Sequence, residues 1–420
     1  MRLAPGTPLA IGLLTEESAT PAPVGRLAMA QGLAQLEWSP EALAARLPID
    51  PMLYPLEPGL LAARTRNFAS GFGGLHGFLS DSLPDAWGVA LMQRRLARMG
   101  QSLAQFSAVD RLALVGKHGR GALVYEPAAL PDEAAATLDL DVLAAESRTI
   151  LLGEESALSD TLATLGGASG GARPKVHVGF SADGQACVAE GDPAPGFDSW
   201  IVKFRAPSDP IDIGVLEEAY ARMARTAGIA MAETRLIPAR EGPGYFATRR
   251  FDRPAPGHRL HMVSLAGAVE AAAHMPSLDY DGFLRATLAI TRHAGDVEQA
   301  YRRMVFNVLA HNRDDHTRQH AYLMDDAGEW RLAPAYDLTF SSGPGGEHYL
   351  AIEHEGREPT RDHVERLCKR HGLSAPAIAA IIDEVRSALA EWPRLAKELG
   401  VTASRQVVTD GLCAVDRKFN

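Results

Sequence analysis

The chain has few cysteines and no long apolar run. Among its 420 residues are three cysteines, Cys187, Cys368 and Cys413, which stand far apart. None belongs to a Cys-x-x-Cys pair, which argues against a zinc ribbon or a thioredoxin-type site, and so few thiols are typical of a reducing compartment. The sequence contains neither the roughly 20-residue apolar run of a membrane span nor the apolar core of a signal peptide. We therefore expect a cytoplasmic protein that makes no membrane contact.

Positive charge is also scarce. Lys and Arg total 42 against 52 Asp and Glu, which gives a formal net charge of -10. This balance argues against a protein that coats nucleic acid through an overall basic field, although a local basic patch stays open. The 46% hydrophobic and 22% charged residues are typical of an ordinary globular protein. A chain of this length exceeds what one hydrophobic core usually serves, so we expect two lobes.

The apolar spacing predicts a mixed α+β first part and a mostly helical second part. One helix is predicted over residues 87–96, with a turn and cap at 80–85. An acidic, alanine-rich surface helix is expected within 131–157. Two strands are predicted next, at 176–180 and 199–204, and a hairpin turn at Asp183-Gly184 follows the first. A helix that ends at Gly228 and a hairpin over 234–248 come after them. Later helices are expected at 280–293, 298–311, 360–372, 374–392 and 393–400. We expect domain limits at 1–130, 131–253 and 254–420.

Lys203 lies within one predicted strand, where an ammonium group is costly unless a phosphate or carboxylate meets it. Glu218, in the next helix, is a natural partner, since a Lys/Glu pair holds the phosphates of ATP in kinases. The alternative is an edge-strand lysine whose ammonium extends to water.

A glycine-rich loop covers residues 166–175. Its backbone N–H groups, including those of Gly170 and Gly171, suit phosphate oxygens, and Arg173 and Lys175 add positive charge. The loop is not a Walker A sequence because no Gly-Lys-Ser or Gly-Lys-Thr triplet follows. Ser169 carries the loop's hydroxyl, and it is either a self-phosphorylation site or a plain loop serine.

The segment 311–320 is rich in His and Asp. Asp314 follows an apolar run and suits a general base that deprotonates an acceptor hydroxyl, while Asp337 suits a ligand of Mg²⁺. A metal hydrolase is a second interpretation, with ligands His311, Asp314, Asp315, His316 and His320. A capped helix end with solvated charges is a third.

The segment 249–253 follows the predicted hairpin, where two lobes would join. Its backbone, with Arg249 and Asp252, suits the binding of adenine, and Phe251 suits packing beside the base. An arginine-rich hairpin end that serves solubility is the alternative.

Together these motifs resemble the HipA family of toxin kinases, in particular HipA-like proteins with a Gly-Gly-Ala-Arg-Pro-Lys loop. The matching segments occur in family order: Asp81–Gly88, Leu112–Gly116, Gly119–Leu123, Gly170–Lys175, Trp200–Phe204, Arg250–Arg253, Asn312–His320 and Leu332–Leu338.

The resemblance implies an α+β, two-lobe protein-kinase-like fold, distantly like that of lipid kinases, with a mixed α+β N-lobe and a mostly helical C-lobe. It implies transfer of phosphate from ATP, with Mg²⁺, to serine or threonine of a protein substrate. The family roles fall on Lys203 for the phosphates, Phe251 and its neighbours for adenine, Asp314 with His316 for catalysis, and Asp337 with Gln319 for magnesium. HipA toxins usually act with a small helix-turn-helix antitoxin of HipB type, through which we expect any contact with DNA.

Two positions depart from the family pattern. Gln319 stands where the family typically has asparagine, and one extra methylene loosens an octahedral Mg²⁺ site. Ala168 stands where the regulatory serine is expected, with Ser169 one place away. These departures favour a second hypothesis, a weakly active or pseudokinase-like module that binds an antitoxin or another protein.

Overall fold

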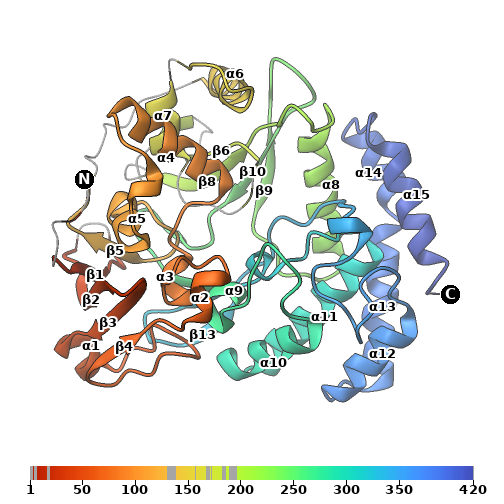
Figure 1. Cartoon of the computed structure of the whole chain (residues 1–420). Coiled ribbons are helices and arrows are strands. Elements are labelled where there is room, and N and C mark those ends of the chain that lie inside the picture. Colours follow the sequence, from red (N-terminus) through yellow and green to blue (C-terminus); the bar gives the residue numbers. More distant parts are fainter. Residues whose placement is uncertain are drawn as a thin grey trace. The chain divides into compact units, whose positions relative to one another are not determined.

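The computed structural model describes residue 3 and residues 7–16, 19–129, 139–156, 158–166, 171, 173–181, 186–188 and 196–419. The chain divides into two compact units. Their helices and strands are labelled in Figure 1. Unit 1 comprises Met1–Pro207, Thr248–Glu270 and Leu323–Trp330. Unit 2 comprises Ser208–Ala247, Ala271–Tyr322 and Arg331–Asn420.

The first sheet of unit 1 is antiparallel, with the strand order β4-β3-β2-β1-β5. Alternate residues of β3 face inward, so Ala34, Leu36 and Trp38 are buried in the core, as expected for a strand with one packed face. Its strands are β1 (Leu9–Leu13), β2 (Ala22–Ala30), β3 (Leu33–Trp38), β4 (Leu60–Ala62) and β5 (Leu123–Glu126).

Among the helices of unit 1, α4 (Ala86–Arg98) confirms the helix predicted over 87–96. It begins after Asp85, whose side chain accepts a hydrogen bond from the Gly88 N–H and so caps the first turn. Helix α6 (Leu140–Leu151) is the described part of the predicted acidic helix. The other helices of unit 1 are α1 (Pro40–Ala45), α2 (Arg66–Ala69), α3 (Gly77–Ser80), η1 (Leu103–Gln105), α5 (Ala108–Val115), α7 (Ser159–Leu165) and α9 (Leu265–Val269).

A second set of strands in unit 1 carries part of the glycine-rich segment. Strand β6 (Lys175–Ser181) pairs antiparallel with β7 (Ala186–Val188) and with β8 (Phe197–Lys203). The predicted turn Asp183-Gly184 lies outside the described residues. Lys203 is the last residue of β8 rather than an interior one, because the pairing of the strands ends there. Strand β11 (His261–Ser264) is hydrogen-bonded to β12 (Ala321–Met324), whose end at residues 323 and 324 belongs to the same unit.

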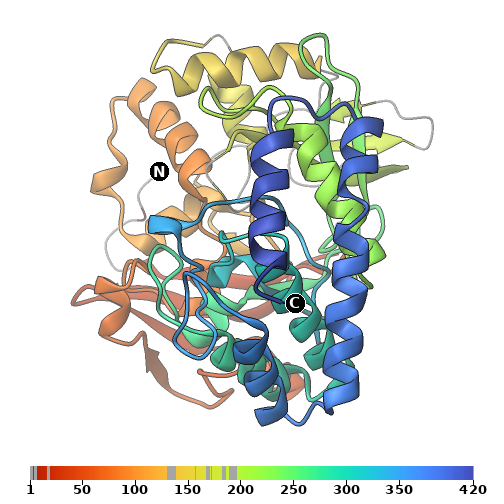
Figure 2. The same ribbon diagram turned by 90° about the vertical axis from the view of Figure 1, so that its right-hand side faces the viewer.

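Unit 2 is mostly helical. Strand β9 (Thr234–Ile237) pairs with β10 (Tyr245–Arg249), whose residues 248 and 249 belong to unit 1, and this pairing confirms the hairpin predicted over 234–248. Helices α10 and α11 pack together, α13 contacts both α8 and α11, and α14 lies beside α15 (Figures 1 and 2). The other elements are α8 (Ile213–Thr226), α10 (Tyr280–Thr291), α11 (Ala294–Leu309), η2 (Thr317–Gln319), β13 (Trp330–Leu332), η3 (Pro344–Gly346), α12 (Arg361–Arg370), α13 (Ala375–Leu389), α14 (Trp392–Glu398) and α15 (Arg405–Asp416).

The bounds of the later helices differ from the prediction by up to four residues. Helix α11 begins at Ala294 rather than residue 298, because the His293 ring caps its first turn by accepting a hydrogen bond from the Asp296 N–H. Helix α13 ends at Leu389, and α14 begins at Trp392. Helix α15 was not predicted at all.

Across the described part of the chain, no helix combines the length and the apolar character that a membrane crossing requires.

Candidate active site

The loop after α11 is fixed by its own backbone. The last turn of the helix is closed by Ala310, and His311 turns the chain through a left-handed conformation at φ 53°. The Asn312 N–H then donates to the Asn307 carbonyl over 2.9 Å, and Asn312 forms a parallel bridge with Ser341. The direction in which the chain leaves α11 is therefore set before Asp314 is reached.

Asp315 is the buried anchor of this loop. Its side chain has no exposed surface, and its Oδ2 accepts hydrogen bonds from the Tyr280 hydroxyl at 2.7 Å and from His348 Nδ1 at 2.8 Å. Its Oδ1 accepts the Tyr349 N–H at 2.8 Å. Burial alone would raise the pKa of Asp315, but the His348 ring and these hydrogen bonds hold it below its usual value. A charged carboxylate thus joins α10 and the segment at 348–349 to the loop.

Asp314, the adjacent residue, is exposed over 48% of its side chain. His316 lies beside it, with Nε2 at 3.9 Å from Asp314 Oδ1. Burial lowers the pKa of His316 by more than the nearby charge of Asp337 raises it. The ring is therefore neutral at neutral pH. Because its Nδ1 accepts the Arg318 N–H at 3.2 Å, we assign the ring proton to Nε2, which faces Asp314. An accessible carboxylate on a fixed loop can take a proton from a hydroxyl group.

Gln319 and Asp337 meet in unit 2. The Gln319 Nε2 donates a hydrogen bond to Asp337 Oδ2 over 3.1 Å. Asp337 holds a left-handed backbone at φ 57°, a conformation that Asp adopts more readily than most residues. Carboxylate and amide oxygens are ligands that Mg²⁺ accepts. The side chains of Asp337 and Gln319 therefore fit a magnesium ion, held by the carboxylate with the amide beside it.

The proposed ligands of a metal hydrolase do not come together. Over the residues that the structure describes, no group of three or more His, Cys, Asp or Glu side chains could hold a metal ion. Both Asp315 oxygens are bound to protein donors, His320 is buried and stacks on Phe283 at 4.0 Å, and His311 stacks on Phe340 at 4.8 Å. The metal-hydrolase interpretation is wrong for this part of the chain.

In unit 1, Lys175 and Lys203 face each other across β6 and β8. Residues directly opposite in an antiparallel pair present their side chains on the same face. Lys175 is buried, and its Nζ lies 3.3 Å from Asp85 Oδ2, whereas Lys203 is partly exposed. A Cβ added at Gly171, where φ is 106°, would lie 2.9 Å from Lys175 Nζ. Two residues predicted for the phosphates, Gly171 and Lys175, are thus in contact, with Lys203 opposite Lys175.

The segment 249–253 is anchored by Asp252. This buried carboxylate accepts hydrogen bonds from Arg250 at 2.8 and 3.0 Å, from Arg253 at 3.0 Å and from the Gly121 N–H at 2.9 Å. Burial acts to raise the pKa of Asp252, but the guanidinium groups of Arg250 and Arg253 hold this pKa well below its usual range. Phe251 beside it is partly exposed.

Arg249 and Glu218 each have charged partners in their own unit. Arg249 pairs with Asp198 at 2.7 Å in unit 1. In unit 2, Glu218 Oε1 accepts a hydrogen bond from Arg222 Nε at 2.7 Å, and its Oε2 accepts the Thr234 hydroxyl at 2.7 Å. Both carboxylate oxygens of Glu218 are therefore engaged on α8 and β9, and its pairing with Lys203 stays a prediction.

The amino-acid sequence matches two family descriptions. Residues 167–392, more than half of the chain, match the HipA-like C-terminal domain. Residues 18–126 match the HipA N-terminal domain. The chain belongs to the HipA family.

This HipA-family chain is 31% identical over 227 residues to a protein of Sinorhizobium fredii that carries the name "Putative kinase Y4dM". The alignment covers 50% of this chain and 50% of that protein, so it spans about half the length of the relative. A HipA chain from a Shewanella oneidensis MR-1 complex of HipA, HipB and operator DNA superimposes with a TM-score of 0.69 at 17% identity, covering 97% of each chain. This similarity confirms the predicted α+β, kinase-like HipA fold.

Some predicted site residues of this HipA-family chain lie outside the described residues. These are Ala168, Ser169 and Gly170 of the glycine-rich loop. The sequence suggested a role for Asp315 only in the metal-hydrolase alternative, and it did not indicate Tyr280 or His348, the partners of Asp315 in the structure. The only sequence signal for this network is the placing of a second Asp directly after Asp314.

Proposed function

We propose that this HipA-family protein is a kinase that transfers the γ-phosphoryl group of ATP, with Mg²⁺, to a serine or threonine hydroxyl of a protein. One observation carries the proposal. The exposed carboxylate of Asp314 follows a fixed turn and directly precedes Asp315, which three hydrogen bonds hold in the interior. This arrangement holds an accessible carboxylate at the surface on a loop whose position is fixed.

In the proposed reaction the acceptor hydroxyl oxygen attacks the γ-phosphorus while the bond from that phosphorus to the bridging oxygen of ADP breaks. The hydroxyl proton passes to the Asp314 carboxylate. His316, with its proton on Nε2 toward Asp314, orients that carboxylate. Asp337 and Gln319 would hold Mg²⁺, which when bound offsets the negative charge of the phosphates.

The residues proposed for ATP itself lie mainly in unit 1. Lys203 binds phosphate oxygens, the backbone of Gly170 and Gly171 wraps them, and Arg173 and Lys175 add positive charge. Arg249, Phe251 and Asp252 form the adenine side of the site. Ser169 is the candidate for self-phosphorylation.

The chemistry of the product tests this proposal. Purified protein incubated with ATP, Mg²⁺ and a cell lysate should add phosphate to protein serine or threonine, as located by mass spectrometry of the lysate peptides. Phosphate found on no peptide, or only on histidine and aspartate, would contradict a serine/threonine kinase.

We also propose a small antitoxin of HipB type as a partner, which makes the protein the toxin of a pair and brings any DNA contact through the antitoxin. The support is the fold shared over 97% of the chain with a HipA that was solved with HipB and operator DNA. Affinity purification from the native host should recover a small helix-turn-helix protein in a fixed ratio. Recovery of the HipA-family chain alone, in low salt and from fresh cells, would contradict this partner.

A binding module without catalysis is the second candidate, and the position of Gln319 favours it. Its side chain lies against Asp337 and is one methylene longer than the asparagine typical of this position, which loosens an octahedral Mg²⁺ site. Calorimetry separates the two candidates: a kinase binds Mg²⁺ and ATP, whereas a module of this kind shows no heat of binding at millimolar nucleotide.

A further inference from the structure

Asp85 performs two tasks in unit 1. Its Oδ1 accepts the Gly88 N–H at 2.8 Å and caps α4, and its Oδ2 lies 3.3 Å from Lys175 Nζ. Both charged side chains are almost wholly buried, with 5% exposed for Asp85 and 3% for Lys175. A buried ion pair strongly disfavours the loss of one partner, because the other charge is then left unpaired. The start of α4 is therefore tied to the end of the glycine-rich loop.

Helix α4 also holds the other end of that loop. Gly166 begins the loop, and a Cβ there would lie 2.5 Å from Leu91 Cδ1 and 3.3 Å from Trp87 Nε1. The same Trp87 Nε1 donates a hydrogen bond to the Lys175 carbonyl over 3.1 Å. Helix α7, which leads into Gly166, packs on α4 and on β6. Both ends of the loop at 166–175 thus rest on one turn of α4.

Asp85 also offsets positive charge that gathers around it. Lys175 and Lys203 lie opposite each other on β6 and β8, and like charges in such a pair repel. Asp85 is the carboxylate that neutralises Lys175. Arg120 adds a further positive charge near Asp85, and its buried Nε and Nη2 have no hydrogen-bond partner among the described residues. The carboxylate therefore lets a concentration of positive charge persist beside the loop.

We infer that Asp85 is a positioning residue for the nucleotide: through Lys175, and together with Trp87, it fixes the ends of the glycine-rich loop that binds the phosphates. The inference rests on the proposed kinase function, since it takes ATP as the ligand of that loop. It makes α4, which belongs to the HipA N-terminal domain, a determinant of ATP affinity.

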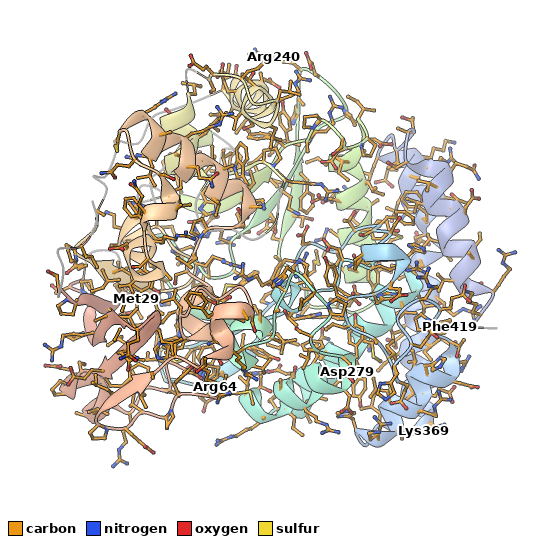
Figure 3. The ribbon with its side chains drawn as sticks, in the orientation of Figure 1. Met29, Arg64, Arg240, Asp279, Lys369 and Phe419 are labelled. Atoms are coloured by element: carbon orange, nitrogen blue, oxygen red, sulfur yellow. The ribbon has the colours of Figure 1, made fainter. Side chains whose placement is uncertain are left out.

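The substitution Asp85→Asn tests the inference, because asparagine keeps the helix cap but removes the charge. Asp279→Asn is the matched control. Asp279 lies at the start of α10 (Figure 3) and accepts the Gly282 N–H at the same 2.8 Å. Calorimetry with ATP and Mg²⁺ should show affinity weakened at least about tenfold in Asp85→Asn, since small displacements of binding groups cost this much. The control should stay within about twofold of wild type, as expected for a cap that is preserved.

Kinetics and a double variant show whether Asp85 acts through Lys175. We expect Asp85→Asn to raise KM for ATP and to leave kcat near the wild-type value, because the residue does not touch the reacting atoms. The variant with both Asp85→Asn and Lys175→Met should bind ATP no more weakly than Lys175→Met alone. Losses that add in the double variant would overturn the inference.

Each remaining outcome has a distinct meaning. If wild type binds no ATP, the proposed function and this inference fall together. If wild type binds ATP and Asp85→Asn binds it equally well, the inference alone is overturned. Should Asp85→Asn fail to fold, Trp87→Phe takes its place, since it removes the N–H that binds the Lys175 carbonyl and keeps an aromatic ring in the core. An unchanged ATP affinity in a folded Trp87→Phe protein would then overturn the inference.

Discussion

The side-chain amide of Gln319 donates a hydrogen bond to Asp337 Oδ2 over 3.1 Å, which brings η2 to the segment after β13. In the proposed kinase both side chains serve the same magnesium ion. The amide must then turn its oxygen toward the ion, and the present hydrogen bond must break. Mg²⁺ demands near-ideal octahedral geometry, so the longer glutamine holds it less well than asparagine would.

The substitution Gln319→Asn should therefore lower the Mg²⁺ concentration that the protein needs for activity. We expect half-maximal activity at an Mg²⁺ concentration about threefold or more below that of wild type, because the shorter side chain is the one that the family typically carries. Titration of kinase activity with MgCl₂ at fixed ATP measures it. Gln406→Asn, on the exposed surface of α15, is the control. A higher magnesium requirement in Gln319→Asn would contradict the proposed role.

Asp314 and Asp315 are adjacent, but replacement by alanine should cost the protein much less stability at Asp314 than at Asp315. Asp315→Ala leaves His348 and the Tyr280 hydroxyl buried without their partner, and we expect a loss of about 3 kcal/mol in the free energy of unfolding. Asp314→Ala removes a half-exposed side chain and should change it by less than about 1 kcal/mol. Urea denaturation of the two variants measures both values. Equal stability of the two variants would show that Asp315 does not anchor the loop.

Gly343 lies against the loop that carries Asp314, at a position where a side chain would meet the backbone of Glu347 and Arg313. Its φ is 66°, and an added Cβ would lie 2.1 Å from the Glu347 carbonyl oxygen and 2.6 Å from Arg313 Cβ. We expect Gly343→Ala to cost at least about 3 kcal/mol of unfolding free energy, since strain and a backbone clash combine. It should also lower kinase activity, because Arg313 directly precedes Asp314.

Gly345→Ala is the matched control for that change. Gly345 also has a positive φ, of 60°, but an added Cβ meets nothing within 4 Å. Gly345→Ala should therefore lose only about 1 kcal/mol of unfolding free energy, which is the cost of placing alanine in a left-handed backbone conformation. If the two alanine variants lose the same stability in urea denaturation, the close approach of Gly343 to the loop is not a constraint.

His261 predicts a pH dependence of stability. Burial lowers its pKa to about 4, and its Nε2 is bonded to the Ile49 carbonyl oxygen at 2.9 Å. Because the folded pKa lies below that of the unfolded chain, the unfolded chain takes up the proton first as the pH falls. Stability contributed by neutral His261 is therefore lost between about pH 6.5 and pH 4.

The substitution His261→Gln keeps an N–H donor near Ile49 but cannot titrate. Thermal unfolding followed from pH 7 to pH 4 should show a smaller fall in Tm for His261→Gln than for wild type. The exposed His274 gives the control variant His274→Gln, whose curve should run parallel to that of wild type. A His261→Gln curve that is also parallel to wild type would show that this histidine does not titrate differently on folding.

The elements with strong local signals could be predicted from the sequence. Asp85 before an amphipathic run marks the start of α4, and Ser374 followed by Pro376 marks the start of α13. Helix α15 gave no such signal, because the Ser404 hydroxyl binds Asp212 instead of capping the helix. Gly411 also interrupts its pattern, and a Cβ there would lie 2.6 Å from Phe340.

In the candidate site, too, some residues could be predicted from local motifs and others could not. Asp314, Gln319 and Asp337 stand in motifs and were predicted as parts of one site, and the structure brings Gln319 and Asp337 together. The anchoring of Asp315 was not predictable, because its partners Tyr280 and His348 are 35 and 33 residues away and neither belongs to a recognisable motif. The pairing of Lys175 with Asp85 spans 90 residues and likewise depends on the folded chain.

The most direct test of the central claim compares phosphate transfer by wild type and Asp314→Ala. Both proteins are incubated with ATP labelled on the γ-phosphate, Mg²⁺ and a cell lysate, beside Asp383→Ala, which removes an exposed carboxylate from α13. We predict labelled proteins with wild type and Asp383→Ala, and none above background with a folded Asp314→Ala. Equal labelling by wild type and Asp314→Ala would contradict the assignment of Asp314 as the catalytic base.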